Sequence, residues 1–182
     1  LLALKHRGGG PVHINLSTEY TRQFDVKSLP EFRVIRRVQV DDHFPEIEAK
    51  RVGIFVGAHL AWSEELTNAV DAFCEQYNGA VLCDHTSNYH GKYRVQFNLV
   101  AAQTNHFYET RKMDLLIDMG EMSGAYMGLE PKEVWRVNPD GQVRDTWKKM
   151  TRIFDMEERV FFQKYVEAKT GHEKNIEYYQ SC

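Results

Sequence analysis

The stretch from Val52 to Cys83 predicts two parallel strands joined by a helix, and this restricts the chain to folds built on a parallel sheet. Val52–Val56 reads VGIFV, an apolar run bounded by Arg51 and Gly57. Continuous rather than alternating hydrophobicity indicates a strand that is covered on both faces, which is typical of parallel sheets. A second apolar run, Ala80–Cys83, predicts the neighbouring strand.

Between these strands the sequence predicts an amphipathic helix with recognisable ends. Ser63 is a favoured N-cap residue, and Glu64 and Glu65 follow it at the positive end of the helix dipole. Asn78-Gly79 is a common C-terminal stop. Apolar residues recur at helical spacing on one face: Leu66, Ala69, Val70, Phe73, Cys74 and Tyr77. The unit of strand, helix and strand should have a right-handed crossover.

Further strands and helices alternate along the rest of the chain. We expect two more inner strands and one edge strand, at Leu115–Met119, Glu133–Val137 and within Arg33–Val40. We expect helical segments around Phe97 to Ala101, around Phe107 to Lys112 and at Met156–Lys169. Strands that alternate with helices predict an α/β fold, here a Rossmann-like doubly wound parallel sheet with helices on both faces.

The overall composition argues against several classes of function. The 182 residues carry a formal net charge of −3, and the pI is about 6.3. The chain therefore lacks the strongly basic character that indicates nucleic-acid binding. No apolar run in the sequence approaches the length of a membrane span. The three cysteines, Cys74, Cys83 and Cys182, are too sparse for a disulfide framework and indicate a reducing compartment such as the cytoplasm.

The segment Gly10–Leu16, GPVHINL, has the pattern of a strand that runs out into a linker. A lone strand leaves its backbone N–H and C=O groups unpaired, so this segment needs sheet neighbours that the few residues before it cannot form. We therefore expect residues 1–29 to be the tail of a preceding domain with its linker, and to pack irregularly. Residues 30–182 should form one domain of ordinary size.

Candidate sites lie in the loops that follow the strands, because ligands of open parallel sheets bind beyond the carboxyl ends of the strands. Three loops qualify: Gly57–Leu60, Asp84–Tyr93 and Gly120–Gly124. The first has one glycine where a dinucleotide fingerprint needs three. It therefore favours a simple turn from strand to helix over a tight NAD site.

The second loop brings Cys83, Asp84, His85 and His90 close together in sequence. A zinc site needs four ligands at a recognisable spacing, and Cys83 falls in a buried strand. An exposed polar loop with incidental histidines is therefore the favoured interpretation. No G-x-S-x-G nucleophile elbow is present, which argues against covalent catalysis. We predict no catalytic, cofactor-binding or metal-binding residues in this chain.

The order of these motifs resembles the central domain of thiamine-diphosphate-dependent enzymes. GPVHINL, VGIFVG, DLLIDMG and NPDG follow one another in this chain at Gly10–Leu16, Val52–Gly57, Asp114–Gly120 and Asn138–Gly141. Members of that family have three α/β domains: a pyrimidine-binding domain, a central domain and a pyrophosphate-binding domain. The resemblance implies that residues 1–29 end the pyrimidine domain and that residues 30–182 form the central domain.

The segment Val134–Asp145, VWRVNPDGQVRD, and the residues after it are most similar to the succinyl-enolpyruvyl-hydroxycyclohexene-carboxylate synthases of menaquinone biosynthesis. This resemblance implies a parent enzyme that decarboxylates 2-oxoglutarate and adds the product to isochorismate. In that family a Gly-Lys-Arg type element in the loop after the third strand faces the substrate carboxylates. Here the matching positions are Gly124-Ala125-Tyr126, without a basic residue, which implies a different acceptor.

The resemblance also implies the substrate-facing positions, namely Gly120, Glu121, Ser123, Gly124 and Tyr126. The family's catalytic glutamate and its magnesium-binding motif belong to the flanking domains. Thiamine diphosphate and magnesium are therefore expected in the full-length protein and not on this chain. The expected partners are the flanking domains and further copies of the parent, in a dimer or tetramer. The alternative is a self-standing Rossmann-like module that binds a nucleotide or an acidic metabolite.

Overall fold

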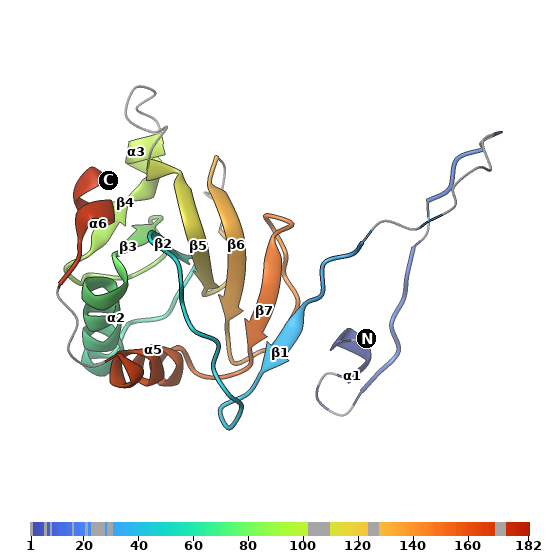
Figure 1. Cartoon of the computed structure of the whole chain (residues 1–182), viewed down its shortest axis with the longest axis horizontal. Helices are drawn as coiled ribbons and strands as arrows, with labels where there is room; N and C mark the ends of the chain where they lie inside the picture. The colour runs from blue at the N-terminus through green and yellow to red at the C-terminus, as the bar shows by residue number, and fades with distance from the viewer. Residues whose placement is uncertain are drawn as a thin grey trace.

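A computed structural model of the chain describes residues 2–182 except 6, 8, 16, 21, 23–27, 29–30, 102–109, 124–127 and 170–173. Its centre is a seven-stranded parallel sheet in the order β1-β7-β6-β5-β2-β3-β4 (Figure 1). The strands are β1 (Arg36–Val38), β2 (Val52–Val56), β3 (Gly79–Cys83), β4 (Arg94–Gln96), β5 (Lys112–Met119), β6 (Glu130–Val137) and β7 (Met150–Phe154). The helices are α1 (Leu2–Lys5), α2 (Glu64–Tyr77), α3 (Phe97–Ala101), α5 (Glu158–Ala168) and α6 (Glu177–Ser181).

The strand order contains one reversal, between β2 and β5. From β2 the chain adds β3 and β4 on one side, and then returns to pair β5 against the other side of β2. β6 and β7 continue outward from β5, and β1 completes that edge. The predicted doubly wound α/β sheet is therefore confirmed. The loops after β2 and β5 both begin at this reversal, which is where such sheets leave a crevice for ligands.

The predicted unit of strand, helix and strand is confirmed almost residue by residue. All five residues of β2 are buried, and the Ser63 hydroxyl accepts a hydrogen bond of 3.1 Å from the backbone N–H of Leu66. Asn78 ends α2 with a left-handed φ of 50°, and its side chain donates to the backbone carbonyl of Lys50. Because β3 begins at Gly79, the helix passes into the next strand without a connecting loop.

Two hydrophobic cores lie on opposite faces of the sheet, because alternate residues of each strand point to opposite sides. Ile54 contributes to the first core, and its neighbour Phe55 contributes to the second. Helices α2 and α5 lie side by side over the first core (Figure 1). The second core is covered more thinly, by the short helices α3 and α6 and by loop residues such as Leu129 and Trp147.

The predicted strand at Gly10–Leu16 is wrong. The described residues 9–15 and 17–20 carry no helix or strand and are exposed, and Figure 1 shows this stretch running away from the sheet. Without neighbouring strands its backbone has no ladder to join. The expectation that Asp84–Tyr93 is an exposed loop is also wrong in part. Ser87 and Tyr89 are fully buried, because their hydroxyl groups donate to the Val56 carbonyl and to Asp71.

Other elements differ in extent from the sequence prediction. The expected edge strand is confirmed but shrinks to β1, and the expected helix at Met156–Lys169 becomes α5. Lys112, expected in a helix, begins β5, while residues 107–109 of that expected helix lie outside the described residues. The sequence did not predict β4, β7 or α6. In the part of the chain that the structure describes, no helix has the length and apolar character needed to cross a membrane.

Candidate functional site

The loops that follow β2 and β5 touch backbone to backbone at the reversal of strand order. The N–H of Gly57 donates to the carbonyl of Met119 at 3.0 Å, and the N–H of Glu121 donates to the carbonyl of Ala58 at 2.8 Å. A Cβ atom on Gly57 would lie 1.8 Å from the Glu121 carbonyl oxygen. Glycine is therefore required at position 57 for the two loops to meet, and this contact separates two cavities.

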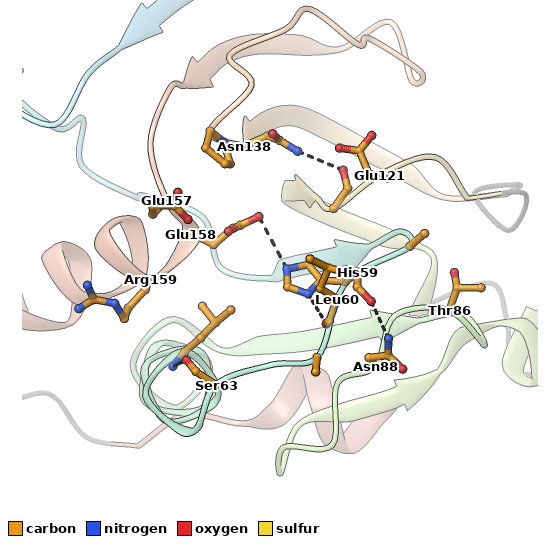
Figure 2. Close-up of a pocket in the computed structure, with 15 residues that line it drawn as sticks. His59, Leu60, Ser63, Thr86, Asn88, Glu121, Asn138, Glu157, Glu158 and Arg159 are labelled. Atoms are coloured by element: carbon orange, nitrogen blue, oxygen red, sulfur yellow. Dashed lines mark hydrogen bonds and ion pairs between the residues drawn. The ribbon is translucent and has the colours of Figure 1, made fainter.

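The larger cavity, here called the switch-point cavity, has a volume of about 980 Å³. It opens between the loops after β2 and β5 and the first turn of α5, as Figure 2 shows. Its size falls within the range of small-molecule and cofactor pockets. The polar and charged lining residues are His59, Ser63, Thr86, Asn88, Glu121, Asn138, Glu157, Glu158 and Arg159.

His59 is fixed in this cavity by contacts on three sides. Its Nδ1 lies 2.8 Å from the Leu60 carbonyl, and its ring packs against Trp62 with the centroids 4.9 Å apart. Its Nε2 faces the Glu158 carboxylate at 3.7 Å (Figure 2). The neighbouring Glu158 raises the pKa of His59 above its usual value, because a carboxylate stabilises the imidazolium form.

The charge of the switch-point cavity is unfavourable for a phosphate group. Its lining includes Glu121, Glu157 and Glu158 against Arg159 and the His59 ring, which already faces Glu158. The first turn of α2, whose N–H groups could otherwise bind an anion, carries two glutamates and is capped by Ser63. Carboxylates at these positions suit hydroxyl-bearing or cationic groups better than a pyrophosphate.

The smaller cavity, here called the Arg136 cavity, has a volume of about 200 Å³ and lies on the second face of the sheet. Phe55, Asp118 and Arg136 are register partners on the adjacent strands β2, β5 and β6. Arg136 is 2% exposed, and its Nη1 donates to the Asp118 carboxylate at 3.0 Å. Burial raises the pKa of Asp118 to about 6 despite this partner. The ion pair of Asp118 and Arg136 thus lies near the carboxyl ends of β5 and β6, on an otherwise apolar face of the sheet.

A second arginine joins this ion pair from the loop after β6. Arg144 forms ion pairs with Asp140 at 2.9 Å and with Glu121 at 2.5 Å. Glu121 lines both cavities, and its carboxylate is paired with Arg144 of the Arg136 cavity. Trp147 and Met122 complete the apolar part of the wall.

The structure brings three of the five predicted substrate-facing residues to these cavities. Gly120 lines the switch-point cavity, Glu121 lines both cavities, and Ser123 lines the Arg136 cavity, where its hydroxyl donates to Asp84. Gly124 and Tyr126 lie outside the described residues. Whether this loop faces a substrate stays a prediction.

The cysteine and histidine cluster after β3 does not have the geometry of a metal site. Cys83 is buried, which raises the pKa of its thiol to about 12. The Asp84 carboxylate accepts hydrogen bonds from Thr86, Ser87 and Ser123. Among the residues that the structure describes, no group of three or more histidine, cysteine, aspartate or glutamate side chains is arranged to hold a metal ion.

The sequence reasoning missed the residues that give both cavities their charge. Arg136 sits inside the predicted strand Glu133–Val137, and a charged residue within an apolar strand is a signal that could have identified it. Arg144 and Glu158 carried no such signal. They reach the site only because the loop after β6 and the start of α5 fold back over the carboxyl ends of the strands.

The fold and these cavities together define a Rossmann-like α/β domain with its ligand crevice at the reversal of strand order. The particular proteins that the chain resembles are named 2-succinyl-5-enolpyruvyl-6-hydroxy-3-cyclohexene-1-carboxylate synthase. This chain is 30% identical to the synthases of Bacteroides fragilis and Bacteroides thetaiotaomicron, and 27% identical to the synthase of Phocaeicola vulgatus. Each similarity covers 90% of this chain, and the resemblance indicated by the sequence motifs is thereby confirmed.

The chain spans about a third of the length of these relatives, between 32% and 33%. No protein-family model matches the chain.

Replacing Gly57 by Ala should strongly destabilise the domain. The new methyl group would overlap the Glu121 carbonyl, so the loops after β2 and β5 must separate. We expect the free energy of unfolding in urea to fall by at least about 2 kcal/mol. Gly10→Ala is the matched control, because a Cβ there meets no atom within 4 Å. It should change stability by less than about 0.5 kcal/mol. Equal unfolding midpoints for the two variants would contradict the role assigned to Gly57.

The pair of His59 and Glu158 should make stability depend on pH. Because the pKa of His59 is raised in the folded state, the stabilisation is fully present below the unfolded value of 6.5. This stabilisation is lost as the pH rises through the higher pKa that His59 has in the folded state. We expect the thermal unfolding midpoint to decline less with rising pH in His59→Gln than in the wild type. Arg159→Gln, which alters a neighbouring charge instead, should keep the wild-type slope. An unchanged slope in His59→Gln would refute the pairing.

Proposed function

We propose that this chain is the central domain of a thiamine-diphosphate-dependent carboligase related to the synthases named above. In this proposal residues 1–29 are the tail and linker of a pyrimidine-binding domain, and residues 30–182 are the central domain. The observation that carries it is the similarity along 90% of this chain and only a third of each relative. The chain itself is non-catalytic, and the parent decarboxylates a 2-oxoacid and transfers the product to an acceptor.

The cofactor chemistry of the parent is assigned to the flanking domains. Thiamine diphosphate supplies the carbanion equivalent when it is bound, and magnesium holds its diphosphate. Asp140-Gly141 lacks the leading glycine of the family's magnesium-binding motif. Moreover, Asp140 forms an ion pair with Arg144, so this carboxylate has a structural partner within the domain. The residues of this chain therefore do not fit the cofactor, and we assign no step of the reaction to them.

In this proposal the central domain contributes the loop Gly120–Tyr126 to the substrate side of the parent. The loop follows β5 at the reversal of strand order, where ligand crevices form. Glu121 and Ser123 already line cavities there. Ala125 and Tyr126 stand where a basic pair is expected, so the acceptor presents fewer carboxylates or a surface for Tyr126.

The remaining partners follow from the same assignment. The flanking domains of the parent contact this domain, and the parent assembles as a dimer or tetramer in the cytoplasm. Neither nucleic acid nor a membrane is a partner, in keeping with the net charge of −3.

A self-standing binding module is the second candidate, and the volume of the switch-point cavity favours it. A volume of about 980 Å³ at the reversal of strand order suits a nucleotide or an acidic metabolite. The glutamates in its lining weigh against both ligands. The encoding reading frame distinguishes the candidates. A frame that continues into domains with the catalytic glutamate and the GDG motif supports the first proposal, and a frame that ends near both termini supports the second.

Tyr126→Ala in the full-length enzyme tests the role of the loop. We expect kcat/KM for the acceptor to fall by about tenfold while the affinity for thiamine diphosphate stays unchanged, because the proposal assigns the loop to the acceptor and the cofactor to the flanking domains. Leu99→Ala, an exposed residue of α3, is the control and should leave both unchanged. Unaltered acceptor kinetics in Tyr126→Ala, or efficient use of isochorismate by the wild type, would contradict the proposal.

Calorimetry of the 182-residue chain with thiamine diphosphate and magnesium tests the placement of the domain. No tight binding is expected, because the activating glutamate and the magnesium-binding motif belong elsewhere in the parent. Micromolar binding by this chain would show that it has been assigned to the wrong domain of the family.

A further inference from the structure

Arg136 has a hydrogen-bond donor that no group in the described part of the chain uses. Its side chain is 3% exposed, and its Nε is buried without a hydrogen-bond partner. The other two nitrogens are engaged: Nη1 donates to Asp118, and Nη2 donates to the Gly120 carbonyl at 3.3 Å. A buried donor of a charged group without an acceptor costs free energy, so its persistence calls for an explanation.

The cavity that Arg136 lines is suited to a carboxylate. Arg144 lies in the same cavity, only 33% exposed, and Thr146 and Trp147 line it as well. A guanidinium group matches the planar geometry of a carboxylate, and a second arginine nearby can bind the other oxygen.

One carboxylate of the protein already reaches into this cavity from an exposed position. Glu121 is 59% exposed at its side chain, yet it forms an ion pair with Arg144 at 2.5 Å. Because exposed ion pairs contribute little free energy, Glu121 can leave Arg144 at small cost. The carboxylates of Asp118 and Asp140 are held more deeply, since their side chains are 10% and 20% exposed.

We infer that the Arg136 cavity is a binding site for a small carboxylic acid, whose carboxylate takes the place of Glu121 on Arg144 and accepts a hydrogen bond from Arg136 Nε. Glu121 is then a competing occupant that covers the site when no ligand is bound. The inference goes beyond the proposed function, because it concerns binding to this domain alone and needs neither thiamine diphosphate nor flanking domains.

The size of the cavity limits the ligand to a short aliphatic acid. About 200 Å³ is below the volume of pockets that hold drug-sized molecules. The charge balance also permits one carboxylate to be exchanged for another. The charged groups that face one another here are Arg136, Arg144, Asp118, Asp140 and Glu121. Displacement moves the charge of Glu121 into solvent, so the carboxylate of the ligand replaces that charge and does not add to it.

Titration of the 182-residue chain with succinate, followed by NMR, tests this inference. The Nε–H resonance of Arg136 should shift downfield as the donor gains an acceptor, and the indole resonance of Trp147 should move with it. Succinamide has the same shape without charge and should bind at least about tenfold more weakly, as expected for losing a charged hydrogen-bond partner. Phosphate tests whether the site selects planar carboxylates over other anions.

Substitutions of Glu121 and Arg144 should change the affinity in opposite directions. Glu121→Gln removes the competitor and should tighten succinate binding about two- to fivefold. Arg144→Gln removes one donor and should weaken it by about tenfold or more. Arg159→Gln, an arginine outside this cavity, is the matched control and should leave it unchanged.

Several outcomes would overturn the inference. One is the absence of a saturable shift of the Arg136 Nε–H resonance with succinate, both in the wild type and in Glu121→Gln. Another is an affinity for succinate that neither Glu121→Gln nor Arg144→Gln alters. Tighter binding of phosphate than of succinate would overturn the assignment to carboxylates. Each outcome is read without enzyme turnover, so it is independent of whether the parent is a carboligase.

Discussion

The backbone contact between the loops after β2 and β5 determines the rest of the site. Two hydrogen bonds join these loops, and a side chain on Gly57 would prevent them from forming. The contact occurs where the strand order reverses, a place that a doubly wound sheet otherwise leaves open. It divides this region into the switch-point cavity on one side and the Arg136 cavity on the other. Glu121 lines both because it lies at the contact itself.

The ion pair of Asp118 and Arg136 is the second feature that packing alone does not explain. Its neighbours in the same row of the sheet are Leu82, Phe55 and Ile153, all apolar and buried. A buried ion pair in such a row is weak evidence for stability, since apolar side chains would pack there as well or better. Its place at the carboxyl end of the strands agrees with a role in binding.

The sequence predicted those elements whose local pattern and tertiary environment agree. β2 and α2 were correct because an apolar run, a cap and a helical stripe all indicate the same structure. β7 was missed because Thr151 and Arg152 interrupt its apolar pattern, and both bond to Glu133 of β6. Glu121 was predicted from its position after a strand. The partners Arg144 and Glu158 come from distant segments, and no local pattern records where a loop folds back.

The two edges of the sheet have a consequence for how the domain meets other proteins. β1 and β4 are each three residues long, and each begins with arginine. Short, charged edge strands offer few free backbone groups for pairing with a strand from another chain. The sheet is therefore protected against growing edge to edge into polymers. A neighbouring protein must instead recognise side chains on its faces and loops, so such contacts can change by single substitutions without altering the sheet.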